Sequence, residues 1–153
     1  MFQTVLFKAC IAMILFAGAL RGQSQFSIHA ASSEPVAGWQ KMQSEDKSIW
    51  VNPIPALVSA DIELAVPFKD PKGHNGVSTT FTEVGAGKMR ELSAAQANKL
   101  VAMILDGKVI FAPLVRGAFP GPDRMVMITG NSPTGLTVGE VQRILVSMNR
   151  SQK

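Results

Sequence analysis

The side chains that commonly do chemistry are few in this sequence, and they are not grouped. The chain has two histidines, His29 and His74, and one cysteine, Cys10. A metal site needs several ligands that converge on one point, and these spacings match no known ligand pattern. His74 lies beside Asp70 and Asn75 in a stretch rich in turn-forming residues, which favours a solvated turn histidine. We therefore predict no metal site and no cofactor.

Two further stretches contain residue types that occur at catalytic or phosphate-binding sites. The sequence "GAGK" at residues 85–88 opens a helical segment, but it lacks the longer glycine loop and the Ser or Thr that follows the lysine in a nucleotide site. Asp61 and Glu63 are two positions apart, so they favour a role as partners of a helix dipole over an acid–base pair. The sequence thus predicts a protein that is not an enzyme, with an enzyme built around His74 as the less favoured alternative.

The charge distribution argues against nucleic acid as a partner. The 153 residues carry a formal net charge of +4, Lys and Arg are scattered, and Tyr is absent. A nucleic-acid-binding surface normally needs clustered basic residues, often with aromatic side chains that stack on bases. With 46% hydrophobic residues, the composition fits one globular domain with a tail.

The N-terminus has the pattern of a secretory signal peptide over residues 1–22. Lys8 precedes twelve uncharged, mostly apolar residues, and the small residues at positions 17–19 suit cleavage. Twelve residues are too few to span a hydrocarbon core of about 30 Å. We expect an exported protein, periplasmic or secreted, with no membrane span after cleavage; a retained anchor is the alternative.

The remaining chain divides into a polar stretch and a domain. Residues 23–47 are rich in Ser, Gln and Ala with no sustained apolar period, which predicts a flexible linker. The domain is expected at residues 48–150, with strands at 48–51, 77–81 and 124–129. A short helix begins at Ser59, a second at about Gly85 with a break near Ser93, and a third at the capping box of Thr137 and Glu140. The predicted class is α+β, an antiparallel sheet with helices mainly on one face.

A central hairpin is predicted at residues 100–112, because Asp106-Gly107 is a strong signal for a two-residue turn. This turn would place Leu105 opposite Lys108 and Met103 opposite Ile110. Val109 and Phe111 then lie on the other face with Ile104.

A candidate partner-binding face follows from matching residue types across strands. The face that carries methionine would contain Met103, Lys108, Ile110, Met125 and Met127. Methionine adapts to irregular partners and recurs on surfaces that accept varied apolar ligands. Two interpretations stay open: the linker, loops or a helix cover this face, or it is an open patch for an extended chain or a sister domain.

Three stretches together resemble a known family: "VNPIPALVSADIELA", "VSTTFTEVGAGKMRELSAAQANKLVAMILDGKVIFAPLV" and "MITGNSPTGLTVGEVQRIL". They are similar to the head subdomain of the first periplasmic domain of SecD/SecDF, the protein-export membrane proteins. In this comparison Met89 is the helix anchor, Ser93 takes the Thr/Ser position, and "ITG" is residues 128–130. The resemblance implies a free-standing exported head that binds protein or peptide, without the transmembrane helices that couple proton flow to export.

The sequence therefore predicts a non-enzymatic binding module that contacts polypeptide or an envelope protein, and the resemblance implies an association with the protein-export machinery. The alternative is a structural adaptor that docks to a membrane complex through residues 116–124.

Overall fold

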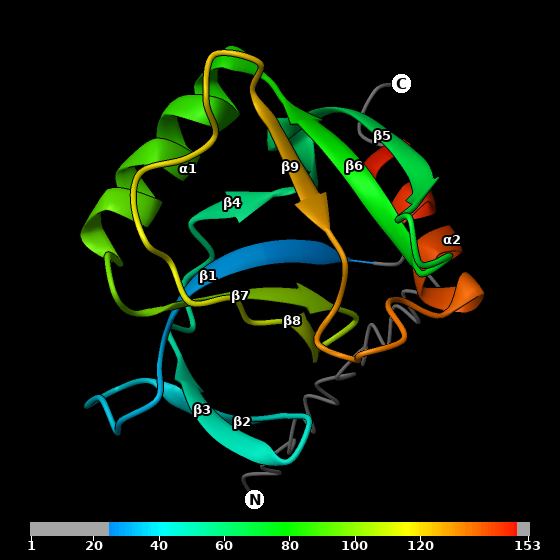
Figure 1. The fold of residues 1–153 in the computed structure, drawn as a ribbon. Helices are drawn as coiled ribbons and strands as arrows, with labels where there is room; N and C mark the ends of the chain where they lie inside the picture. Colours follow the sequence, from blue (N-terminus) through cyan, green and yellow to red (C-terminus); the bar gives the residue numbers. More distant parts are fainter. Residues whose placement is uncertain (1–24, 150–153) are drawn as a thin grey trace, which may run out of the picture.

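The computed structural model describes residues 25–149, which form two antiparallel sheets and two helices (Figure 1). In chain order the elements are β1 (Phe26–Ser32), β2 (Gln40–Ser44), β3 (Lys47–Val51), β4 (Leu57–Val58), a 3₁₀ turn (Ser59–Asp61), β5 (Ile62–Lys69), β6 (Asn75–Phe81), α1 (Glu83–Ala95), β7 (Leu100–Leu105), β8 (Lys108–Phe111), β9 (Met125–Ile128) and α2 (Val138–Asn149). The α+β class is confirmed, with strands divided between two sheets. The predicted signal peptide lies outside the described residues.

The larger sheet, which we call sheet A, has the strand order β2-β3-β1-β7-β8, with β4 paired to β1. Its central strand, β1, falls inside the stretch that the sequence predicts to be a linker. That prediction is wrong, because β1 pairs with β7 over six residues, from Phe26 opposite Leu105 to Ala31 opposite Leu100. The domain therefore begins at least 20 residues earlier than expected at position 48.

The polar residues of β1 are compatible with the interior because they find partners there. The buried ring of His29 is hydrogen-bonded to the Ser27 hydroxyl at 2.8 Å and to the Asn52 main-chain oxygen at 2.7 Å. A buried polar group is costly only when it lacks such partners. The polar composition of residues 23–47 therefore gave no indication of the central strand that lies within them.

The β7–β8 hairpin turns at Asp106 and Gly107, whose φ angles are 52° and 80°. Both values are positive, as the predicted turn type requires. Leu105 lies opposite Lys108, as predicted. The next pair, Ile104 with Val109, continues this register, which then shifts so that Met103 lies opposite Phe111. The predicted pairing of Met103 with Ile110 is therefore wrong, because a β-bulge is inserted there.

The smaller sheet, sheet B, has the order β5-β6-β9. The sequence predicts a helix from Ser59 towards Pro67, but the helical part is one 3₁₀ turn and β5 follows directly. Asp61 explains why the turn forms, since its buried carboxylate accepts hydrogen bonds from the Val58 N–H at 3.0 Å and the Lys88 ammonium at 2.8 Å. The helix α1 packs so closely here that a Cβ on Gly85 would collide with the Asp61 main-chain oxygen.

Both helices begin at side-chain caps. Thr82 accepts a hydrogen bond from the Gly85 N–H at 2.9 Å at the start of α1, and the predicted capping box of Thr137 and Glu140 is present before α2. The predicted break at Ser93 is wrong. Its hydroxyl bonds the main chain of Phe119 instead and leaves the helix continuous to Ala95.

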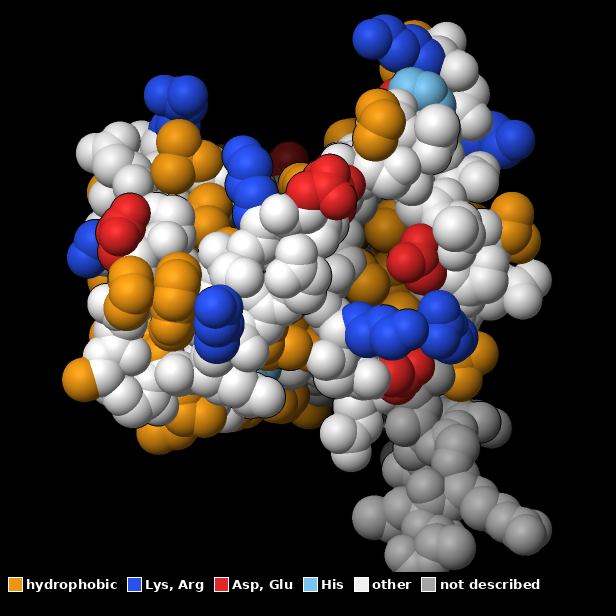
Figure 2. All heavy atoms as spheres, turned by 90° about the horizontal axis from the view of Figure 1, so that it is seen from below, with side chains coloured by type: hydrophobic (Ala, Val, Ile, Leu, Met, Phe, Trp, Pro, Cys, Tyr) orange, Lys and Arg blue, Asp and Glu red, His pale blue; other side chains and the backbone are white. Residues whose placement is uncertain are grey.

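Two apolar clusters hold the fold together, and α1 and α2 flank it on opposite sides (Figure 1). The larger cluster contains side chains of both sheets and both helices, and the smaller lies on the other side of sheet A around Ile49, Val51 and Ile104. Within residues 25–149, no helix is long and apolar enough to cross a membrane. Lys and Arg alternate with Asp and Glu over the face that Figure 2 shows, with no continuous basic block.

Candidate functional site

The five residues predicted to form one binding face do not share a surface. Met103 and Ile110 belong to the larger apolar cluster, with exposed fractions of 1% and 9%. Lys108 is exposed, but it lies at the hairpin of sheet A, whereas Met125 and Met127 lie on β9 in sheet B. The predicted common face is wrong because β8 and β9 belong to different sheets.

The two faces of the hairpin also differ from the prediction. The face of Met103 lies in the larger cluster with Val101 and Leu105. Ile104 and Val109, whose stiff β-branched side chains favour a core position, line the smaller cluster. Residue type did not predict the direction, because Met packs in irregular interiors as well as it adapts on surfaces.

The exposed methionines form part of a different surface, which we call the outer face of sheet B. Across its three strands, Leu64, Thr80 and Met125 lie in one row, and Val66, Ser78 and Met127 lie in the next. The exposed fractions are 51% for Leu64, 42% for Val66, 42% for Met125 and 58% for Met127. Four large apolar side chains are thus exposed on two neighbouring rows, two of them on β5 and two on β9.

The alternation of strand side chains explains why this face is exposed. The intervening residues Ala65, Val77 and Ile128 are buried in the larger cluster, on the opposite face of the same strands. Thr79 is also buried on that side, and its hydroxyl donates to the Val126 main-chain oxygen at 2.8 Å. The inner face of sheet B therefore supports the core, and the outer face is not needed for it.

Leu64 and Val66 are the part of this surface that the sequence analysis missed. They fall in the segment that it assigned to a short helix and its extended exit. The alternation in "IELAVPF", with Ile62 and Ala65 buried and Leu64 and Val66 exposed, is the signal that was available. A register shift between Ile62 and Leu64 interrupts the period and weakens that signal.

An ion pair borders one end of the outer face. The Arg124 guanidinium lies 3.0 Å from the Glu63 carboxylate. This ion pair connects β5 with the residue before β9, at the level of the last residue of β6. A partly exposed pair of this kind orients side chains more than it stabilises the fold.

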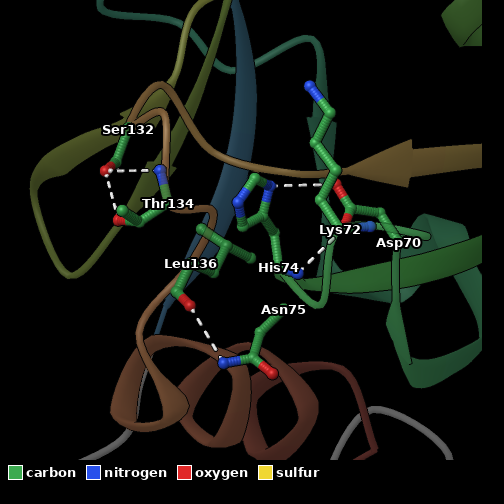
Figure 3. Close-up of polar contacts among 7 residues, drawn as sticks. All are labelled: Asp70, Lys72, His74, Asn75, Ser132, Thr134 and Leu136. Atoms are coloured by element: carbon green, nitrogen blue, oxygen red, sulfur yellow. Dashed lines mark hydrogen bonds and ion pairs between the residues drawn. The ribbon is translucent and has the colours of Figure 1, made fainter.

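A hydrogen-bonded turn borders the other end, between β5 and β6 (Figure 3). The Asp70 carboxylate accepts hydrogen bonds from the main-chain N–H groups of Lys72 and His74, each at 2.8 Å, and contacts the His74 ring at 3.0 Å. The N–H of His74 is the main reason that the pKa of Asp70 lies below its ordinary value of 3.8; the N–H of Lys72 and the His74 ring act in the same direction, against partial burial.

The same turn rests on the loop that precedes α2. The Asn75 amide donates to the Leu136 main-chain oxygen at 3.4 Å, while Ser132 and Thr134 bond one another within that loop (Figure 3). Within residues 25–149, no group of three His, Cys, Asp or Glu side chains is placed to hold a metal ion. The contacts of His74 and Asp70 are those of a structural turn.

A hollow of about 510 Å³ lies between α2 and the end of the β5–β6 hairpin. Its walls include Phe68, Val141 and Leu145, with Lys69 and Gln142 among the polar lining residues. This lining is suited mainly to apolar contact.

Comparison with known proteins places this fold. Residues 36–137 match the family described as "SecDF, P1 head subdomain". The protein translocase subunit SecDF of Thermus thermophilus is 32% identical over 59% of this chain and 14% of its own length. The chain thus spans about one seventh of that relative.

Solved structures of SecDF share the fold. A structure titled "Crystal structure of SecDF in Super-membrane-facing form" matches 84% of this chain and 19% of its own, with a TM-score of 0.62 and 23% identity. "Structure and function of a membrane component SecDF that enhances protein export" gives the same score and identity over 84% of this chain and 63% of its own. Because the family match extends over most of the described residues, the chain belongs to the family of the SecDF P1 head subdomain.

Proposed function

We propose that this protein is an exported, non-enzymatic module that binds extended polypeptide segments in connection with protein export, through the outer face of sheet B. The observation that carries the proposal is the group of four exposed apolar side chains on two adjacent rows, Leu64, Val66, Met125 and Met127. Exposed apolar side chains that are grouped on one face, as opposed to scattered singly, mark interaction sites on soluble domains.

The chemistry of this face suits many different polypeptides. Met125 and Met127 are flexible and polarisable, so they adapt to side chains of varied shape. Between them and the apolar side chains of β5 lie Thr80, which is half-buried, and Ser78, which is buried, so the exposed part of this face is mostly apolar. A surface that is apolar but not rigid fits a partner without a unique sequence.

The family relationship supplies the biological setting of the proposal. One relative is named a protein translocase subunit, and another is titled a membrane component that enhances protein export. This chain covers 14% of the first of these proteins and 63% of the second, so an association of this chain with the protein-export machinery is part of the proposal. An exported location is also part of it, and rests on the signal-like residues 1–22.

The test is a binding titration of the full chain with an unfolded secretory polypeptide that carries a fluorescent label. Replacing Met125 and Met127 together with Ser is expected to weaken binding about tenfold, because two apolar contacts are lost. The control is Val84→Ser, which removes an apolar side chain of α1 that is 68% exposed and lies away from sheet B's outer face. Val84→Ser is expected to bind as the wild type does.

Two results would contradict the proposal. One is wild-type protein that does not bind the polypeptide at any concentration reached. The other is a double variant that binds as tightly as wild type. Crosslinking of a single folded partner at residues 116–124, together with absent polypeptide binding, would support the adaptor alternative instead.

A further inference from the structure

We propose that the bound polypeptide adds to sheet B as a further β-strand along the outer edge of β9. This inference rests on the proposed function, and it specifies which groups of the protein make the hydrogen bonds. Strand addition uses the main-chain groups of β9, whereas the outer face contributes side-chain contacts.

The direction of the main-chain groups of β9 follows from one hydrogen bond. The Phe81 N–H donates to the Arg124 main-chain oxygen at 2.9 Å, just before β9 begins. Hydrogen-bonded positions of an antiparallel pair recur at every second residue, so Val126 and Ile128 direct their N–H and C=O groups towards β6. Met125 and Met127 therefore direct theirs away from the sheet.

These outward groups are largely unused within the described part of the chain. The Met125 N–H reaches the Asp123 carboxylate at a long 3.3 Å. The Met127 N–H and C=O have no hydrogen-bond partner among residues 25–149. Unpaired main-chain groups on an exposed strand are a template for another extended chain.

The opposite edge of sheet B is less suited to strand addition. Pro67 lies on β5 opposite Val77, at a position whose main-chain groups face away from β6 by the same alternation. Proline has no N–H to offer there, and the register shift between Ile62 and Leu64 distorts the strand further.

The outer edges of sheet A are tied to one another through a side chain. The Asn131 amide donates to the Ser44 hydroxyl at the end of β2, and its oxygen accepts from the Ala112 N–H just after β8, each at 2.8 Å. Because Asn131 bridges these two edges, we expect neither to accept a new strand without losing that bridge. Compared with the edges at β5, β2 and β8, the edge at β9 is therefore the one that best accepts a strand.

The geometry also specifies the partner. A strand beside β9 would place every second side chain next to Met125 and Met127, on the outer face. Because β9 has only four residues, the contact is short and the affinity is modest. The expected partner is an extended segment, free of proline, with apolar residues at alternate positions.

The test compares Met127→Pro with Met127→Ala in the full chain. Both variants lose the methionine side chain, but only proline also removes the outward N–H. Binding of the unfolded polypeptide is expected to be about fivefold weaker for the proline variant than for the alanine variant, because one hydrogen bond to the added strand is lost. Equal binding by the two variants, both folded by amide NMR spectra, would overturn strand addition.

A second measurement keeps the test decisive if the proline variant does not fold. Wild-type protein is titrated with a short peptide of alternating Thr and Val, and with two derivatives that are N-methylated on alternate residues. One derivative is expected to lose binding and the other to keep it, because only one set of N–H groups faces β9. Equal binding by both would overturn the inference, whereas absent binding of both peptide and polypeptide would overturn the proposed function itself.

Discussion

The two sheets use the same residue types in opposite ways. Sheet A has apolar clusters on both of its faces, and a side chain joins its two outer edges. Sheet B has one buried face, one exposed apolar face and an open edge at β9. The comparison shows that both faces of the β7–β8 hairpin are structural, whereas the available apolar surface lies on the outer face of sheet B.

Two methionines illustrate this difference between the sheets. Met103 in sheet A is 1% exposed and Met127 in sheet B is 58% exposed, although both belong to short apolar strands. The position of a side chain relative to the core therefore decides whether it stabilises the fold or is available to a partner.

The largest expected effect on stability is the difference between replacing Met103 and replacing Met127. Met103→Ala is expected to lower the free energy of unfolding by about 3 kcal/mol, because it leaves a cavity in the larger cluster. Met127→Ala is expected to change it by no more than about 0.5 kcal/mol, since its side chain is exposed. Urea unfolding of the two variants measures both values, and similar losses would contradict the division between the sheets.

The next largest effect on stability is expected at Asn131, whose side chain joins the two outer edges of sheet A. Asn131→Ala is expected to cost about 2 kcal/mol, because the Ala112 N–H loses its acceptor and the Ser44 hydroxyl loses its donor. Hydrogen exchange at Ala112 and along β2 would quicken. Ser132→Ala, which alters an exposed neighbour, is the control, and an equal loss there would remove the special role of Asn131.

The outer face of sheet B gives a smaller effect on stability. Leu64→Thr and Val66→Thr are each expected to leave the free energy of unfolding within about 0.5 kcal/mol of wild type, because both side chains are exposed and Thr suits a strand. Binding of an apolar fluorescent dye should fall in both variants. A large loss of stability would show that the outer face is structural.

The sequence predicted those parts of the fold whose signals are local. The Asp106-Gly107 turn and the Thr137–Glu140 capping box are each determined by adjacent residues, and both are present. The β-bulge that places Met103 opposite Phe111 was not predicted. Next to it, Ile110 and Ala112 are hydrogen-bonded to Asn131 of the distant loop after β9, a contact that adjacent residues do not reveal.

Predicting the central strand β1 and the outer face of sheet B would have required knowledge of long-range contacts. His29 and Ser27 are acceptable in the interior only because they bond each other and Asn52, which is 23 residues away from His29. The outer face joins residues 64 and 66 to residues 125 and 127 through β6. Residue types alone favoured grouping Met125 and Met127 with Met103, since no pattern shows which strands share a sheet.

The smallest expected effect concerns the turn that closes the β5–β6 hairpin, at the end of sheet B away from Arg124. The pKa of Asp70 is lowered in the folded state, so its ionised form stabilises the fold above the ordinary pKa of 3.8, and this contribution is lost as the pH falls through the lower folded value. Asp70→Asn should therefore reduce the fall in melting temperature on acidification from pH 5 towards pH 3. Because the His74 N–H is the main cause of the shift, His74→Gln, which keeps that N–H, should retain most of the wild-type pH dependence. If His74→Gln abolished it as fully as Asp70→Asn does, the imidazole ring, not the main chain of the turn, would control the Asp70 carboxylate.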